Sequence, residues 1–130
     1  MRQSTPPGTP TIAIVDDDEA VKDALESFIR SLGYVAVTFA SALELLNYPG
    51  LADLSCLISD VQMAGTTGLE LHDRLVAAGR LIPTILITAY PNEEGRTRAV
   101  KAGVVCYLKK PFPEQELLTC LEGALKRTAP

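Results

Sequence analysis

The chain has 130 residues, of which 47% are hydrophobic, and its net charge is −4. This length suits one domain with a buried core, and the hydrophobic fraction excludes a disordered chain. The acidic balance gives no electrostatic basis for binding nucleic acid or an anionic lipid surface, and no apolar run reaches the roughly 18 residues of a membrane span.

The first ten residues, MRQSTPPGTP, contain three prolines and no hydrophobic periodicity. Residues 1–10 are therefore predicted to be a flexible tail. They also lack the apolar stretch of a signal peptide, so we expect a cytoplasmic protein. From residue 11 onward, short apolar runs and helical patterns alternate five times.

Five short apolar runs predict β-strands. In chain order they are TIAIV (11–15), YVAVTF (34–39), LSCLISD (54–60), PTILIT (83–88) and VVCYLKK (104–110). Near-continuous apolar strands are typical of a parallel sheet that is buried on both faces.

Helical patterns and capping signals separate these strands. The first helix has apolar residues at helical spacing from Val21 to Leu32, with Asp18 as its cap and Gly33 as its stop. Ser41 with Glu44, and Thr67 with Glu70, have the spacing of capping boxes. Asn92 and Gly103 bound the fourth helix, and Pro113 suits the first turn of the fifth.

Strands that alternate with helices predict an α/β fold in which right-handed crossovers place helices on both faces of the sheet. With five such units, the sequence predicts one small doubly wound domain over residues 11–127.

Polar residues end four of the five predicted strands. Asp16 and Asp17 follow the first strand, Asp60 ends the third, Thr88 the fourth and Lys110 the fifth. Parallel strands place these ends on one edge of the sheet, which is where open α/β sheets bind ligands. We therefore expect these side chains to share one pocket.

The predicted pocket suits phosphoryl transfer to an aspartate. Three carboxylates in one cleft raise each other's pKa unless a cation lies between them, and oxygen ligands favour Mg²⁺ or Mn²⁺. A carboxylate can attack phosphorus, while a lysine and a threonine can hold phosphoryl oxygens. Asp60 stands alone at a strand end and is the candidate nucleophile, whereas Asp16 and Asp17 suit metal binding.

The motifs IVDDDE, LISDVQM, ILITA and YLKKPF, in this order and spacing, resemble the receiver domain of two-component response regulators of the FixJ type. The resemblance covers about residues 11–126. It implies a flavodoxin-like (βα)5 three-layer sandwich whose five-stranded parallel sheet has the strand order 2-1-3-4-5.

The resemblance also implies roles for the residues of the pocket. Asp60 would accept a phosphoryl group from a sensor histidine kinase, with Lys110 as the family lysine. Asp17 would bind Mg²⁺ directly and Asp16 through water, and the Gln62 backbone carbonyl would complete the protein ligands. The protein would catalyse only its own phosphorylation and dephosphorylation and would not otherwise be an enzyme.

A second group of residues matches the family's switch. Thr88 matches the switch hydroxyl and Tyr107 the switch aromatic, so phosphorylation would alter the surface formed by the fourth helix, the fifth strand and the fifth helix. That surface would control an output domain, a dimer contact or a downstream protein. Gln62 and Tyr90 occupy positions that tune the lifetime of the phosphoryl group, although Tyr90 fits a solvent-exposed loop tyrosine equally well.

Two further features of the family pattern concern the loops. The bond between Lys110 and Pro111 is typically cis in the family. The chain has Met63-Ala64 where the family usually has Met-Pro, so the loop MAGTTG is expected to be looser.

Three alternative functions use the same fold or chemistry. A phosphatase of the haloacid-dehalogenase type needs a second aspartate where this chain has Gln62. A binding module that is never phosphorylated would lack a pocket residue, and none is missing. A flavodoxin-like FMN carrier would place acidic residues against a bare phosphate.

The remaining chemistry-bearing residues have plainer interpretations. Cys56, Cys106 and Cys120 form no C-x-x-C pair and are expected to be buried reduced thiols rather than zinc ligands. His72, the one histidine, is expected on the surface of the third helix. The chain stops after the fifth helix at KRTAP without a helix-turn-helix, which fits either a single-domain regulator or a fragment cut at a linker.

Overall fold

The fold is a five-stranded parallel sheet between two layers of helices, and the computed structural model describes residues 8–63 and 65–128. The strand order is β2-β1-β3-β4-β5, which confirms the predicted doubly wound topology. The strands are β1 (Thr11–Val15), β2 (Val35–Phe39), β3 (Cys56–Asp60), β4 (Thr84–Thr88) and β5 (Cys106–Lys109). Most of the predicted tail, and Ala64 of the predicted loose loop, lie outside the described residues.

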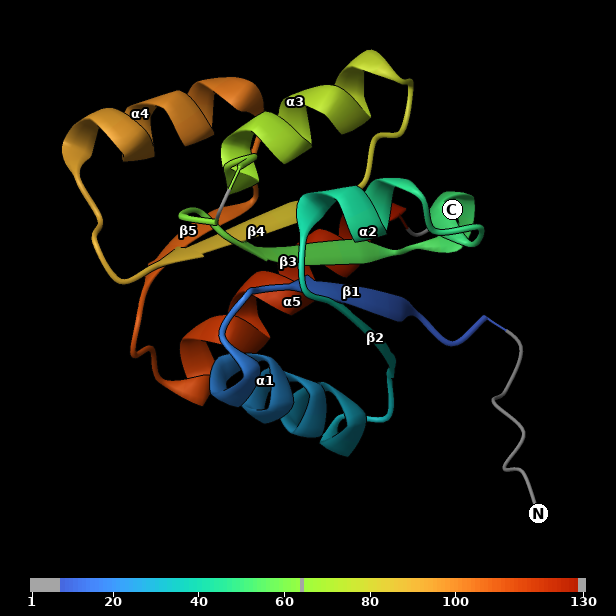
Figure 1. Ribbon diagram of the computed structural model, residues 1–130. Helices are drawn as coiled ribbons and strands as arrows, with labels where there is room; N and C mark the ends of the chain where they lie inside the picture. Colours follow the sequence, from blue (N-terminus) through green and yellow to red (C-terminus); the bar gives the residue numbers. More distant parts are fainter. Residues whose placement is uncertain (1–7, 64, 129–130) are drawn as a thin grey trace.

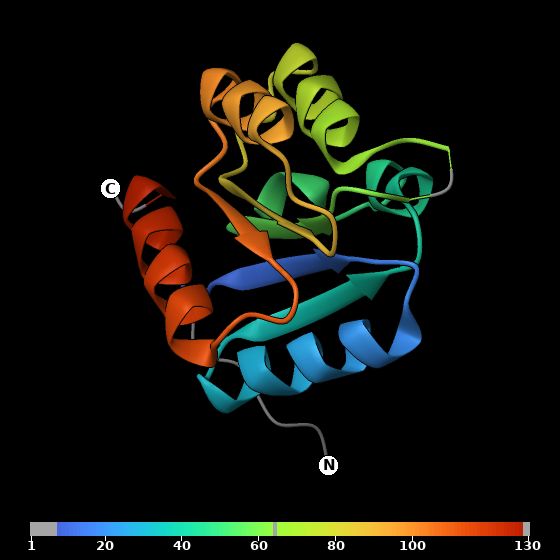
Figure 2. The ribbon, with the colours of Figure 1, turned by 90° about the vertical axis from the view of Figure 1, so that its left-hand side faces the viewer.

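In residues 8–63 and 65–128, five α-helices and one short 3₁₀ helix alternate with or follow the strands. They are α1 (Glu19–Ser31), α2 (Ala42–Leu46), η1 (Leu51–Asp53), α3 (Gly68–Ala77), α4 (Glu93–Ala102) and α5 (Glu114–Thr128). Helices α1 and α5 cover one face of the sheet, and α2, α3 and α4 cover the other (Figures 1 and 2). In the described part of the chain, no helix is both long enough and apolar enough to cross a bilayer.

The register of the sheet aligns the carboxyl ends of its strands. Val15 of β1 pairs with Ser59 of β3, and Asp60 pairs with Ile87 of β4. Thr88 in turn pairs with Lys109 of β5. Because all pairings are parallel, the residues that follow β1, β3, β4 and β5 emerge at one edge of the sheet.

The core is divided by the sheet. On the face under α1 and α5, isoleucines of three central strands pack against apolar residues of both helices; the buried members are Ile12, Ile14, Leu25, Ile29, Ala36, Cys56, Ile58, Ile85, Ile87, Leu117, Cys120, Leu121 and Ala124. On the other face, a second cluster lies under α2 and α3, and a small third cluster lies under α4. Alternate side chains of each strand therefore pack against the helices on opposite faces of the sheet.

The predicted helix caps are present, with one difference. The Asp18 carboxylate accepts from the N–H groups of Ala20 and Val21, and the capping box of Thr67 and Glu70 is complete. The Ser41 hydroxyl accepts from the Glu44 N–H as expected, but the Glu44 carboxylate accepts from the N–H of Ala40. Other caps are the Asn92 side chain at α4 and Gly103, which ends α4 at a φ of 87°.

The prediction of three reduced cysteines is wrong for two of them. Cys106 of β5 and Cys120 of α5 form a disulfide, with Cα atoms 6.1 Å apart. They are 14 residues apart in sequence, and α5 returns along the sheet far enough to bring them together. Cys56 is a free thiol in the core, where burial raises its pKa to about 12.

The prediction of a surface position for His72 is also wrong, because its side chain is buried with only 5% exposed. It lies on the inner side of α3 beside Leu71 and Leu75, which both pack into the core. Its Nδ1 atom has no hydrogen-bond partner among the described residues, and burial lowers its pKa, so the ring is uncharged at neutral pH.

Candidate phosphoryl-acceptor site

The acidic residues predicted to share a pocket do lie together. Asp16 and Asp17 follow β1, Asp60 is the last residue of β3, and one carboxylate oxygen from each lies within 4.8 Å of the other two. Asp16 is fully buried and Asp60 nearly so, whereas Asp17 is exposed. The cluster therefore has a closed inner side and an outer side that an ion can reach from solvent.

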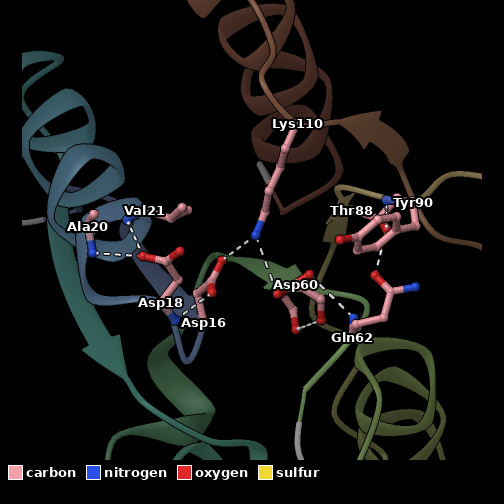
Figure 3. Close-up of polar contacts among 10 residues, drawn as sticks. Asp16, Asp18, Ala20, Val21, Asp60, Gln62, Thr88, Tyr90 and Lys110 are labelled. Atoms are coloured by element: carbon pink, nitrogen blue, oxygen red, sulfur yellow. Dashed lines mark hydrogen bonds and ion pairs between the residues drawn. The ribbon is translucent and has the colours of Figure 1, made fainter.

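Lys110 enters the same cluster from the loop after β5. Its Nζ atom donates to Oδ2 of Asp16 at 2.9 Å and lies 3.3 Å from Oδ2 of Asp60 (Figure 3). Lys109 is exposed, and the Lys110–Pro111 bond is cis, as the family resemblance implied. Residues 94 positions apart thus meet because the strands that carry them end at one edge.

The charges in the cluster are not balanced by Lys110 alone. Burial raises the pKa of Asp60, and the neighbouring charge of Asp16 raises it further, although Lys110 lowers it in part. Burial by itself lowers the pKa of Lys110, but its hydrogen bond to Asp16 and the charges of both aspartates outweigh burial, so this pKa is raised. The lysine therefore stays protonated. Its single positive charge does not balance three carboxylates, so a further cation would stabilise the cluster.

The three consecutive aspartates have separate places in the structure. Asp16 points inward and also accepts from the Asp18 N–H at 2.9 Å. Asp17 is exposed at the rim of the cluster. Asp18 caps α1 by accepting hydrogen bonds from the N–H groups of Ala20 and Val21 (Figure 3). The crowded acidic stretch is thus divided between a buried pocket residue, a rim residue and a helix cap.

Thr88 lies beside the acidic cluster and makes two hydrogen bonds. Its hydroxyl donates to Oε1 of Gln62 at 2.7 Å and accepts from the Tyr90 N–H at 3.0 Å (Figure 3). The Gln62 backbone N–H donates to Oδ1 of Asp60 at 3.3 Å. All four residues are candidates on sequence alone, but the hydrogen bond between the Gln62 side chain and Thr88 depends on the path of a loop and was not predicted.

The Tyr90 side chain is 74% exposed. This matches the interpretation as a solvent-exposed loop tyrosine. Its hydrogen bond to Thr88 is donated by the backbone N–H.

Tyr107 is a residue of β5 whose side chain packs against α4, and it is only 9% exposed. The Arg96 guanidinium lies 5.0 Å from the centre of its ring and also donates to its carbonyl oxygen. A Cβ atom placed on Gly95 would lie 2.8 Å from the Tyr107 hydroxyl oxygen, which is closer than such atoms approach. Gly95 is therefore the point at which α4 makes room for this tyrosine, a contact that the sequence did not indicate.

Residues 12–122 match the family model described as the response regulator receiver domain. The chain belongs to this family. It is 41% identical over 115 residues to the response regulator protein TmoT of Ectopseudomonas mendocina, covering 88% of this chain and 52% of that protein. It therefore spans about half the length of the curated relatives it matches.

Solved structures give the same relationship. The response regulator StyR superposes with a TM-score of 0.84 at 38% identity, over 92% of this receiver chain and 60% of that chain. The crystal structure of FixJ-N superposes with a TM-score of 0.81 at 30% identity, over 90% and 94% of the two chains. The family match favours a response regulator receiver over the phosphatase and flavin-carrier alternatives.

Proposed function

We propose that residues 11–127 form the receiver domain that takes a phosphoryl group from a sensor histidine kinase onto Asp60. One observation carries this proposal: the Asp60 carboxylate ends the third strand within one cluster with Asp16, Asp17 and the Lys110 ammonium group. In the transfer, a carboxylate oxygen of Asp60 forms a bond to phosphorus while the bond from phosphorus to the histidine nitrogen breaks. The products are an aspartyl phosphate and a free kinase histidine.

The donor set fits a divalent metal ion. Three carboxylates supply only hard oxygen ligands. Burial, and after it the charge of Asp16, raise the pKa of Asp60 despite Lys110, so a further cation would stabilise the ionised carboxylate. Asp17 and Asp60 would bind Mg²⁺ directly together with the Gln62 carbonyl, and Asp16 would bind it through water. Mg²⁺ supplies neutralisation of the charge on the phosphoryl oxygens, and Mn²⁺ has the same ligand preference.

Lys110 and Thr88 complete the site. The Lys110 ammonium group already lies 3.3 Å from Asp60, so it is placed to hold an oxygen of a phosphoryl group bound there. The Thr88 hydroxyl would donate to another of these oxygens. Such positioned charges and donors suit phosphoryl transfer, in which the protein supplies positioning and charge neutralisation.

The output of the switch is proposed to be the surface of α4, β5 and α5. Tyr107 connects β5 with α4, and it would move when Thr88 changes partner. The partners would be a sensor kinase and either an output domain, a second copy or a downstream protein, with no direct contact between this domain and nucleic acid. The family relationship supports a cytoplasmic location for this exchange.

Intact-mass measurement after incubation with acetyl phosphate tests the proposal. We expect a phosphoryl adduct that forms with Mg²⁺ and not with excess EDTA. The adduct should be lost in Asp60→Asn and kept in Asp53→Asn, a matched change at an exposed position near the opposite end of β3. An unchanged mass with Mg²⁺ contradicts the proposal, and rapid multiple turnover with release of free phosphate indicates a phosphatase instead.

A further inference from the structure

The Thr88 hydroxyl is already fully engaged in this structure. It has one hydrogen, which it donates to Gln62 Oε1 at 2.7 Å, and it accepts from the Tyr90 N–H. Thr88 is fully buried, so water does not offer its hydroxyl an alternative partner. The 2.7 Å separation is that of a well-formed O–H···O hydrogen bond.

We propose that the Gln62 side chain is a latch: it competes with the phosphoryl group for the Thr88 hydroxyl and so opposes the switched state. This inference rests on the proposed function and deepens it. A hydroxyl donates only one hydrogen bond, so Thr88 must release Gln62 before it donates to a phosphoryl oxygen on Asp60. Gln62 thereby acts through Thr88 and is a positioning residue.

The surroundings of Gln62 indicate how large the effect of its hydrogen bond to Thr88 should be. Gln62 follows Asp60 by two residues, and its backbone N–H is tied to the Asp60 carboxylate. Its side chain is on the exposed rim, so a released Gln62 amide can bond to water. The net effect of such a bond is therefore modest, equivalent to a change of about twofold to tenfold in an equilibrium.

Fluoroberyllate, a non-covalent mimic of the phosphoryl group, provides an equilibrium measurement of the switch. In Gln62→Met the side chain keeps its length and loses its acceptor, while the backbone N–H and carbonyl remain. We expect this variant to bind fluoroberyllate in the presence of Mg²⁺ about twofold to tenfold more tightly than wild type, as measured by calorimetry. Weaker or unchanged binding overturns the latch.

A double-mutant cycle shows whether the effect passes through the hydroxyl. Thr88→Val removes the hydroxyl with little change in volume, and Thr88→Ser keeps it. The gain from Gln62→Met should persist in the Thr88→Ser background and fall to less than about twofold in the Thr88→Val background. An equal gain in both backgrounds overturns the latch, because Gln62 would then act on the ligand or on water directly.

The NMR chemical shift of the Tyr90 amide provides a second test, and it does not depend on phosphorylation. Its N–H donates to the Thr88 oxygen, so its NMR chemical shift reports where that oxygen lies. In ligand-free Gln62→Met we expect this resonance to move from the wild-type position toward that of the fluoroberyllate complex. An unmoved resonance contradicts the latch.

The failure of the latch can be told from failure of the proposed function. Wild type that does not bind fluoroberyllate, or that binds it equally well after Asp60→Asn, overturns both. Wild type that binds it through Asp60, with Gln62→Met unchanged, overturns the latch alone.

Discussion

Helix α4 is packed much less deeply against the sheet than α1 and α5, which cover the opposite face. Under α1 and α5, Leu25 and Ile29 from one helix and Leu117 and Leu121 from the other pack into one continuous cluster with the strands. Under α4, the only buried residue of the helix is Ala99. The sequence of α4, EEGRTRAVKA, has few apolar residues, and this helix adds little to the core.

This difference shows where a small chemical change can act. Helix α4 packs over Tyr107 and next to the strand that ends at Thr88, so this weakly packed helix lies beside the proposed switch. Elements with few buried apolar contacts open at low free-energy cost. We therefore expect α4 to respond to modification of the site more readily than α1 and α5.

The largest expected difference comes from alanine substitutions in α1 and α4. Ile29 in α1 is fully buried, and Ile29→Ala should lower the free energy of unfolding by about 2–5 kcal/mol. Val100 in α4 is 69% exposed, and Val100→Ala should change it by less than about 0.5 kcal/mol. Urea denaturation measures both, and similar losses would contradict the comparison.

The second test concerns the disulfide that joins β5, the strand beside α4, to α5 on the well-anchored face. Reduction of the Cys106–Cys120 bond opens a loop of 14 residues and should lower the free energy of unfolding by up to about 3 kcal/mol. Thermal unfolding with and without reductant measures this loss. The double variant Cys106→Ala/Cys120→Ala is the control and should not respond to reductant.

The third test concerns the Asp60 carboxylate, at the carboxyl edge of the sheet that separates the two helix layers. The folded-state pKa of Asp60 is raised, so the folded protein binds a proton here more readily than the unfolded chain does. The resulting penalty is absent below the unfolded pKa of about 4, grows as the pH rises and is complete above the folded-state pKa.

Asp60→Asn removes this penalty. It should raise the free energy of unfolding at pH 7 by no more than about 1 kcal/mol, since solvent screens part of the repulsion. The gain over wild type should vanish near pH 4 and shrink when Mg²⁺ is added. Denaturation across this pH range measures it, and a gain that grows toward acid would show that the sign is wrong.

The smallest expected effect is local. Fluoroberyllate with Mg²⁺ should change the hydrogen-exchange rates of the amides in α4 and β5 by about tenfold or less. We expect the ligand to affect only this weakly packed helix and the strand beneath it. The amides in the middle of α1 should exchange at the same rate with and without the ligand. Mass spectrometry of peptic fragments compares the two helices in one sample, and an equal change in both would remove the distinction between the layers.

The sequence by itself determined the order of elements, the parallel sheet and the identity of the pocket residues. Strand and helix periodicity and capping residues act over a few neighbours, so they are legible in one chain. The convergence of Asp16, Asp60 and Lys110 was predictable because parallel strands bring their carboxyl ends to one edge.

Only the tertiary structure decided the contacts between side chains of different elements. The pairing of Cys106 with Cys120, the burial of His72, the Gln62–Thr88 hydrogen bond and the fit of Tyr107 against Gly95 all depend on how one element packs on another. Local pattern shows which side of a helix is apolar, but it does not fix rotations and loop paths of a few ångströms. Those distances decide which atoms meet.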